Sequence, residues 1–289
     1  MPEGQVETPI VSSISGLSET ADAWLLDVWG VMHNGITPFE DSVAACQAFR
    51  ERGGYILLLT NAPRPAAAVV AQLDRIGVPR TAYDAIVTSG DVTRGVVQAW
   101  GERSVYYLGP ERDLGIFNDL DVSFAPASEA NAVVCTGLLD DETETPDDYA
   151  DLLAGFRTRG AVMLCANPDL RVERGNRIVY CAGAIAQAYE KLGGEVIYSG
   201  KPYAPTYELA LKTVGNGLQT EIVKERVLAI GDGVQTDIRG AATAGIRSVF
   251  IASGIHVDRT KQLDSATVTE LFSTFESGRP VAAMPALVW

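Results

Sequence analysis

The chain has 289 residues, of which 47% are hydrophobic, enough for one large domain or two modest ones. Its 23 Lys and Arg against 37 Asp and Glu give a net charge of −14. A negative field of this size argues against nucleic acid and anionic membrane surfaces as partners, although a small anionic substrate is compatible with a local cluster of donors or a metal.

The first third of the chain alternates apolar strands with helices. Gly53 and Gly54 end a segment with helical spacing of apolar residues, and a fully apolar run follows them. Strand–helix–strand alternation favours a parallel sheet covered by helices. The elements predicted up to residue 88 are a helix at Ser15–Ala23, a strand ending on Asp27, a helix at Asp41–Arg52, a strand at Tyr55–Leu59, a helix at Pro65–Ile76 and a strand at Ala85–Thr88.

The alternation continues in the rest of the chain. The predicted strands are Ser104–Leu108, Ala132–Cys135, Ala161–Cys165, Arg226–Ile230 and Ser248–Ile251, and the predicted helices are Tyr149–Arg159, Ala182–Leu192, Thr206–Val214 and Asp237–Ala244. There is no internal repeat and no long linker. A second α/β unit inserted between two halves of the first fits this order, and periodicity alone leaves the insertion open.

The cysteines, the histidines and the length of the apolar runs indicate the cellular compartment in which we expect the protein. The four cysteines form no C-x-x-C pair and lie in apolar runs, which indicates buried, reduced thiols; they are Cys46, Cys135, Cys165 and Cys181. His33 and His256 are too few and too isolated for a histidine-based metal site. No stretch reaches the ~18 consecutive apolar residues of a membrane span, and residues 1–7 lack the features of a signal peptide. We expect a cytoplasmic protein with no membrane partner.

Chemistry-bearing residues follow four of the apolar strands or begin the next helix. They are Asp27, Thr60 with Asn61, Lys201 between Gly200 and Pro202, and Asp232 between two glycines, with Asp237 shortly after it. Strand ends of an open parallel sheet share one crevice, so we expect these side chains to lie close together.

Such a set suits phosphoryl transfer. A carboxylate can attack phosphorus and form an aspartyl phosphate, while a hydroxyl and an ammonium group hold the phosphoryl oxygens. Carboxylates and a backbone carbonyl are ligands that Mg²⁺ prefers. Each residue alone also has an ordinary explanation: Thr60 as a helix N-cap, Lys201 as a solvated surface lysine, Asp232 as a turn residue and Asp237 as an acid favoured at a helix N-terminus. The combination favours catalysis.

These motifs, in this order, resemble the haloacid dehalogenase superfamily of phosphohydrolases, and within it the class IIA branch of nitrophenylphosphatase-like and pyridoxal-phosphatase-like enzymes. The resemblance covers about residues 20 to 275. It rests on Leu26-Asp27-x-x-Gly30-Val31, Leu59-Thr60-Asn61, Gly200-Lys201-Pro202 and Gly231-Asp232-x-x-x-Thr236-Asp237, with Asn167-Pro168-Asp169 and Ala182–Ile185 in the cap. It implies a doubly wound, parallel-sheet, Rossmann-like core at 1–89 and 199–289 with an inserted α/β cap domain at 90–198.

The resemblance also implies roles for single residues. Asp27 would be the nucleophile and a Mg²⁺ ligand, with the Trp29 backbone carbonyl, Asp232 and a supporting Asp237 completing the metal site. Thr60 and Asn61 would bind the phosphoryl oxygens, and Lys201 would neutralise them and steady Asp27. Asn167, Asp169 and Arg171, with Arg174 and Arg177, would select the substrate from the cap, although a solvated charged loop is an alternative for this segment.

Trp29 departs from the family pattern. Superfamily phosphatases usually carry a second Asp two residues after the nucleophile, where it protonates the leaving oxygen and then activates water. Trp29 has no useful pKa, so a proton-transfer contribution of ~10²–10⁴-fold is missing. His33 is a candidate for the missing acid–base group, because the ordinary pKa of histidine suits proton transfer near neutral pH. The alternative is that His33 is a structural loop residue hydrogen-bonded to the backbone.

The sequence therefore predicts a Mg²⁺-dependent phosphohydrolase acting on a small phosphorylated metabolite such as a sugar phosphate, nucleotide or aryl phosphate. The alternative is a catalytically weak or inactive member that binds a phosphometabolite for regulation. A third interpretation, dehalogenase or phosphonate chemistry, is disfavoured by the metal-site acids Asp232 and Asp237. A homodimer formed through the cap is a further expectation from the resemblance.

Overall fold

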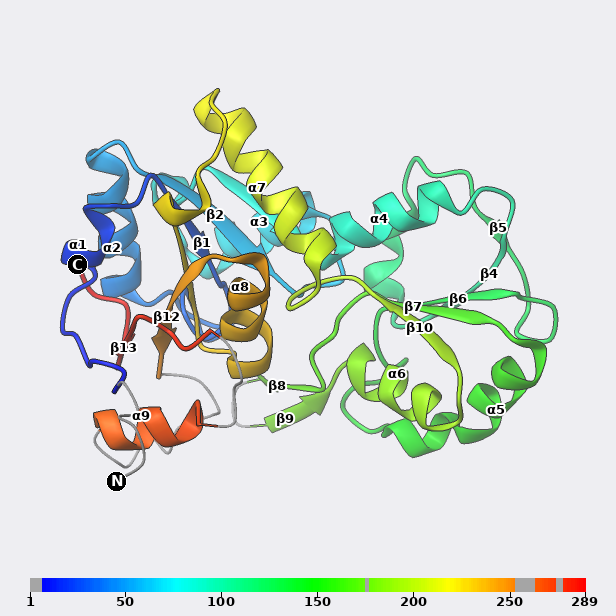
Figure 1. The fold of residues 1–289 in the computed structure, drawn as a ribbon. Helices are drawn as coiled ribbons and strands as arrows, with labels where there is room; N and C mark the ends of the chain where they lie inside the picture. The colour runs from blue at the N-terminus through cyan, green and yellow to red at the C-terminus, as the bar shows by residue number, and fades with distance from the viewer. Residues whose placement is uncertain (1–6, 175–176, 253–262, 274–277) are drawn as a thin grey trace. The chain divides into compact units, whose positions relative to one another are not determined.

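The computed structural model describes residues 7–174, 177–252, 263–273 and 278–289 (Figure 1). The chain forms two compact units. Unit 1 comprises the described residues of Met1–Leu59, Gln72–Ile86 and Tyr207–Trp289, and unit 2 those of Thr60–Ala71 and Val87–Thr206. The core and cap boundaries expected from the sequence stay a prediction.

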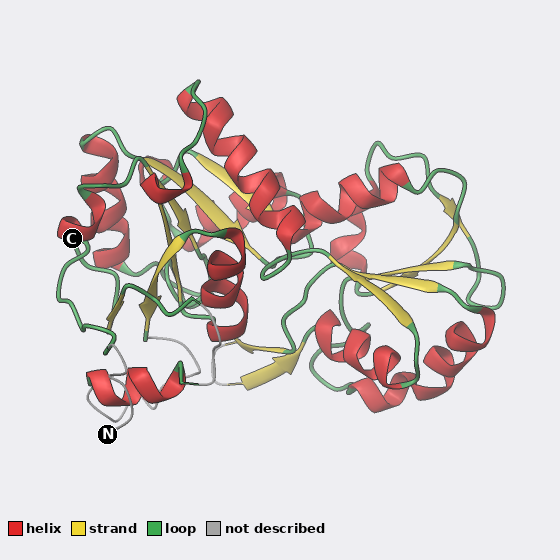
Figure 2. Ribbon diagram, in the orientation of Figure 1, coloured by secondary structure: helices red, strands yellow, loops and turns green. Residues whose placement is uncertain are grey.

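The sheet of unit 1 has six strands in the order β13-β12-β11-β1-β2-β3. Their bounds are β1 Ala23–Leu26, β2 Tyr55–Thr60, β3 Ala85–Thr88, β11 Val227–Gly231, β12 Arg247–Ile251 and β13 Ala282–Met284. Pairing is parallel between β1 and both its neighbours, and again from β11 through β12 to β13. Figure 2 shows helices on both sides of these strands, which explains why they read as continuous apolar runs.

The register of this sheet aligns the ends of its central strands. Leu26, the last residue of β1, pairs with Leu58 of β2 and with Ile230 of β11. The chain therefore leaves β1 and β11 at the same edge of the sheet, which brings the residues after β1 next to those after β11.

The helices of this part of the chain are α1 Ser15–Ser18, α2 Glu40–Glu51, α3 Ala66–Ile76, α7 Ala204–Leu218, α8 Arg239–Ala244 and α9 Ser265–Leu271, with short helical turns η1 Arg80–Ala82, η4 Lys224–Arg226 and η5 Val234–Ile238.

Unit 2 has a parallel sheet of its own, in the order β10-β7-β6-β4-β5. Its strands are β4 Ser104–Leu108, β5 Ser123–Phe124, β6 Ala132–Cys135, β7 Val162–Cys165 and β10 Glu195–Tyr198. Its helical segments are α4 Ser89–Ala99, η2 Glu111–Phe117, η3 Pro146–Tyr149, α5 Ala150–Arg159 and α6 Ala182–Lys191.

Both faces of this second sheet are covered. Alternate residues of β6 point to opposite faces: Ala132 and Val134 pack in a cluster with α4 and η2, while Val133 and Cys135 pack in a cluster with α5 and α6. Figure 1 shows α4 on one side of the strands and α5 and α6 on the other. The expected α/β class with parallel sheets is thus confirmed.

Several element predictions need correction. The helix expected from Ser15 ends at Ser18, because β1 already begins at Ala23. The helix expected from Asp237 is preceded by the π-helical turn η5, and α8 begins only at Arg239. The sequence analysis also missed α4, α9, β5, β10, β13 and the antiparallel hairpin of β8 Arg171–Arg174 and β9 Arg177–Tyr180.

Two compositional expectations can be compared with the structure. All four cysteines are buried and none forms a disulfide, as their apolar surroundings predicted. Among the described residues, no helix combines the length and the apolar character needed to span a bilayer.

Candidate active site

Three carboxylates gather at the edge of the unit 1 sheet. One oxygen each of Asp27, Asp232 and Asp237 lies within 4.8 Å of the others. Asp27 directly follows β1, and its backbone N–H donates to the carbonyl of Ile230 at 2.9 Å. Asp232 directly follows β11, so the parallel pairing of β1 with β11 is what brings the first two acids together.

Asp237 reaches the cluster from the π-helical turn η5. Its Oδ2 accepts hydrogen bonds from the Gly233 N–H at 3.1 Å and from the Thr236 hydroxyl at 3.4 Å. These bonds orient the side chain.

Glycines make room for two of the three carboxylates. Gly30 has φ +86°, and a Cβ at this position would lie 2.3 Å from Asp232 Oδ2. A Cβ at Gly231 would lie 2.2 Å from the carboxyl carbon of Asp237. The turn after β1 and the end of β11 are therefore shaped around the acids.

The donor set fits Mg²⁺. Three carboxylates this close repel one another unless a cation or a proton compensates their charge, and hard oxygen ligands favour Mg²⁺. Asp27 and Asp237 are buried, at 7% and 6% exposure, which strengthens the repulsion that a cation would relieve.

The change Gly30→Ala should weaken the apparent Mg²⁺ affinity by about 10- to 100-fold, the range typical of residues that support metal ligands. The added methyl group would displace the Asp232 carboxylate, and an alanine at positive φ adds strain of about 1–2 kcal/mol. Isothermal titration with Mg²⁺ measures the affinity.

Gly53→Ala is the matched control for this change. Gly53 has φ +85° and nothing within 4 Å of a built Cβ, so it carries the same backbone strain without the collision. Equal Mg²⁺ affinities of the two variants would contradict the assignment of Gly30 as the space for Asp232.

The loop after β1 folds around Trp29 and His33. Their rings meet edge to face with centroids 5.2 Å apart, and a Cβ at Gly35 would lie 2.6 Å from Trp29 Cη2. The Gly30 N–H donates to the His33 carbonyl at 2.9 Å, and the Gly35 N–H donates to His33 Nδ1 at 2.9 Å. His33 therefore holds both ends of this turn.

Burial lowers the pKa of His33 from 6.5 to about 4, and the side chain is only 2% exposed. At neutral pH the imidazole is uncharged, so any acid–base role of His33 begins from the neutral form. Its role in proton transfer stays a prediction.

The pKa of His33 makes stability depend on pH. Between pH 6.5 and about 4 the unfolded chain binds a proton at His33 that the folded chain does not. The free energy of unfolding should therefore fall as the pH drops through this range, by about 3 kcal/mol from this residue. Urea unfolding at pH 7 and pH 4.5 measures the loss, and it should shrink in His33→Asn, which keeps an acceptor for the Gly35 N–H. An unchanged loss in that variant would exclude His33 as its source.

A second group of the expected site residues lies in unit 2. Asn61 Oδ1 accepts from the Lys201 N–H at 2.7 Å, and Asn61 Nδ2 donates to the Lys201 carbonyl at 3.2 Å and to Asp169 Oδ1 at 2.9 Å. The Asp169 N–H donates to Asn167 Oδ1 at 3.0 Å. A Cβ at Gly200 would lie 2.6 Å from Asn61 Oδ1, so this glycine lets the amide approach Lys201.

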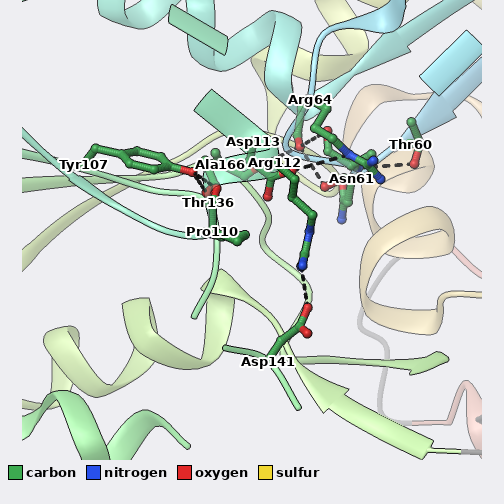
Figure 3. Close-up of polar contacts among 12 residues, drawn as sticks. Thr60, Asn61, Arg64, Tyr107, Pro110, Arg112, Asp113, Thr136, Asp141 and Ala166 are labelled. Atoms are coloured by element: carbon green, nitrogen blue, oxygen red, sulfur yellow. Dashed lines mark hydrogen bonds and ion pairs between the residues drawn. The ribbon is translucent and has the colours of Figure 1, made fainter. Parts of the chain in front are cut away.

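Lys201 is not a solvated surface lysine. It is only 3% exposed. Thr60 and Asn61 are also buried, with exposed fractions of 7% and 5%. The Thr60 hydroxyl accepts from the Ala62 N–H at 3.2 Å, which bends the chain after β2 (Figure 3).

Two arginines of unit 2, Arg64 and Arg171, have different partners. Arg64 Nε lies 3.5 Å from Asp113 Oδ1 (Figure 3). Arg171 donates to the Tyr180 hydroxyl at 2.9 Å and stacks on its ring, so it is held within the β8–β9 hairpin. His256 and the side chain of Arg174 lie outside the part of the chain that is described.

The structure thus brings together two sets of the predicted residues, one in each unit. Asp27, Asp232 and Asp237 meet in unit 1, and Asn61, Lys201, Asp169 and Asn167 meet in unit 2. Sequence reasoning missed the ion pair of Arg64 with Asp113 and the start of α4, whose Thr88 and Asp91 form a capping box. The T-x-x-D pattern at these positions was an available signal for that helix start.

Comparison with known proteins agrees with the motifs. Residues 24–123 match the family model of haloacid dehalogenase-like hydrolases, and residues 198–276 match a second model of the same hydrolase type. The chain is similar to the 5'-nucleotidase YutF of Bacillus subtilis, with 23% identity over 240 residues that cover 82% of this chain and 89% of the relative.

Solved structures share the fold over nearly the whole chain. The 4-nitrophenylphosphatase of Thermotoga maritima superposes with a TM-score of 0.72 at 21% identity, covering 93% of this chain and 96% of that one. A haloacid dehalogenase-like hydrolase of Brucella suis superposes with a TM-score of 0.87 at 45% identity, covering 96% of this chain and all of that one. This identity over nearly full length, together with the two matching models, shows that the chain belongs to the haloacid dehalogenase-like hydrolases.

Proposed function

We propose that the protein is a Mg²⁺-dependent phosphatase that cleaves a small phosphate monoester through an aspartyl phosphate on Asp27. The observation that carries the proposal is the cluster of Asp27, Asp232 and Asp237 within 4.8 Å, with Asp27 at the end of the central strand β1. The names of relatives support the substrate class, since they include a 5'-nucleotidase, a ribonucleotide monophosphatase and an acid sugar phosphatase.

In the proposed reaction, a carboxylate oxygen of Asp27 attacks phosphorus and the bond from phosphorus to the ester oxygen breaks. The ester oxygen leaves with that electron pair as an alkoxide and takes a proton from solvent to give the alcohol. Water then attacks phosphorus of the aspartyl phosphate, returns a proton to solvent, and releases inorganic phosphate and the Asp27 carboxylate. Mg²⁺ held by Asp27, Asp232, the Trp29 carbonyl and a supporting Asp237 would supply charge neutralisation for the anionic ester.

The unit 2 residues would bind the transferred group. We propose that the Thr60 hydroxyl and the Lys201 ammonium hold the phosphoryl oxygens. Asn61 belongs to the same group, and its side-chain amide is engaged by the Lys201 backbone and by Asp169, so it would also fix the position of Lys201. Asp169, Asn167 and Arg171 would contribute to the choice of substrate.

Trp29 favours a second candidate function. With no titratable group at its position, the protein could bind a phosphometabolite and turn it over slowly or not at all, acting as a regulatory binder. The presence of Asp27 beside two further acids favours the phosphatase, because a binder needs no nucleophile. A cytoplasmic location and a homodimer formed through the cap remain predictions.

A phosphatase panel tests the proposal. Nucleotides, sugar phosphates and aryl phosphates are assayed with Mg²⁺ and with a chelator, and phosphate release that requires Mg²⁺ is the expected result. Release of phosphate at equal rates with the chelator would contradict the metal-dependent mechanism. Tight binding of one ester without any release would favour the regulatory binder.

A further inference from the structure

Ser89 makes hydrogen bonds to the backbone at and beside Asn61, one of the residues of unit 2 proposed to bind the phosphoryl group. It is the first residue of α4 and is completely buried. Its hydroxyl donates to the Asn61 carbonyl at 2.8 Å and lies 3.1 Å from the Ala62 carbonyl, and it makes a further short hydrogen bond to the Ala166 carbonyl. One hydroxyl proton therefore serves carbonyls from two separate segments, the loop after β2 and the end of β7.

The first turn of α4 supports the rest of the same loop. The Gly90 N–H donates to the Ala62 carbonyl at 3.1 Å, and Asp91 Oδ1 accepts from the Ala66 N–H at 3.2 Å. A Cβ at Gly90 would lie 2.5 Å from the backbone of Arg64, so the loop and the helix are in direct contact. Since Ala62 has Gly90 as a second donor, the hydroxyl of Ser89 matters most for Asn61 and Ala166.

The two segments that Ser89 joins meet again at the side chain of Asn61. Asn61 bonds both backbone groups of Lys201 and the carboxylate of Asp169, while Ala166 directly precedes the Asn167–Asp169 segment. Ser89 is thus part of a closed network. Its hydroxyl hydrogen-bonds Asn61 and Ala166, the side chain of Asn61 hydrogen-bonds Asp169, and the chain connects Asp169 back to Ala166. Figure 3 shows Asn61 and Ala166 among these polar contacts.

We infer that Ser89 is a positioning residue for the phosphoryl-binding group, acting through Asn61 on the backbone of Lys201. The inference rests on the proposed function. Without the hydroxyl, two buried carbonyls lose their shared donor, and the loop and the Asn167–Asp169 segment move apart to regain hydrogen bonds. Ser89 does not contact the substrate; it fixes the positions of Asn61 and Lys201.

Ser89→Ala tests the inference. Because a displacement of about 1 Å costs on the order of 10²-fold in rate, we expect kcat/KM to fall by about 10- to 100-fold and the inhibition constant of inorganic phosphate to rise. The Mg²⁺ activation constant should stay at the wild-type value, because the carboxylates that would hold the metal belong to unit 1. A merely structural defect would lower thermal stability without this separation of phosphate binding from Mg²⁺ activation.

Thr93→Val is the matched control, because it removes another completely buried hydroxyl of α4, one that donates to the Ser89 carbonyl at 2.8 Å. Its phosphate inhibition constant should stay close to wild type. Equal phosphate constants in Ser89→Ala, Thr93→Val and wild type would overturn the inference. If Ser89→Ala does not fold, Ser89→Cys keeps a weaker donor of similar shape and should show an intermediate loss.

Failure of the proposed function can be told apart from failure of this inference. If the wild type hydrolyses no ester, the phosphatase proposal fails, and calorimetric binding of inorganic phosphate still measures the effect of Ser89. Weaker phosphate binding in Ser89→Ala alone supports the positioning role, and unchanged binding overturns it while leaving any phosphatase activity of the wild type in place.

Discussion

Asp27→Asn should abolish the turnover of every ester that the wild-type protein hydrolyses, with a loss of at least about 10⁴-fold in kcat, as for other enzymes that lose their nucleophile. An amide oxygen of the same shape is a poor nucleophile, and a neutral side chain gives Mg²⁺ a weaker ligand. The fold should persist, because the bond that ties Asp27 to Ile230 uses the backbone N–H. Phosphate release under Mg²⁺ saturation measures the effect.

Asp22→Asn is the control for this change. Asp22 precedes the same strand, is about half exposed and pairs with Arg226 on unit 1, so its loss should leave turnover unchanged. Trapping of radiolabelled phosphate on the wild type, and its absence in Asp27→Asn, would locate the covalent intermediate. Turnover by Asp27→Asn that survives a mass-spectrometric check for deamidation would refute Asp27 as the nucleophile.

The second prediction concerns the leaving group. With Trp29 in place of an acid, alkyl phosphates should react about 10²- to 10⁴-fold more slowly than aryl or acyl phosphates, whose leaving oxygen needs no proton. His33 offers little help as an acid at neutral pH, since burial lowers its pKa to about 4. Plotting log kcat/KM against the pKa of the leaving alcohol, from nitrophenol to simple alcohols, should give a steep negative slope.

Trp29→Asp should flatten that slope by raising the rates of the alkyl esters selectively. Trp29→Phe is the control, because it keeps an aromatic ring against Gly35 and His33 and should retain the steep slope. A wild-type slope near zero would mean that another group already supplies the proton, and the explanation based on Trp29 would then be wrong.

Where the sequence predicted an element, the bounds of the strands were closer to the structure than those of the helices, although β5, β8, β9, β10 and β13 were missed. Tyr55–Thr60 and Ala132–Cys135 are apolar because helices cover both faces of their sheets, and such runs have clear bounds. The start of α4 was missed because Gly90, Thr93 and Gly95 weaken a helical pattern that the capping box and packing restore. The β8–β9 hairpin was missed because its arginines and exposed Ile178 show no alternating pattern.

The sequence could predict which site residues lie together only where the ends of paired strands fix their positions. Asp27 and Asp232 each directly follow a strand of a pair in parallel register, so their proximity follows from topology. The bonds of Asn61 to Lys201 and Asp169 join residues 140 and 108 positions apart, and no local pattern signals them. The burial of His33, which lowers its pKa, likewise depends on tertiary packing that the sequence does not encode locally.

The order of strands in unit 1 has a consequence for synthesis on the ribosome. β1 lies between β2, which follows it closely in the chain, and β11, which begins only at Val227. An emerging chain can pair β1 with β2 early, while the other edge of β1 waits for about two hundred further residues. Asp27 therefore gains Asp232 and Asp237 late in translation, so the nascent protein passes most of its synthesis without the acidic cluster and with one edge of its central strand unpaired.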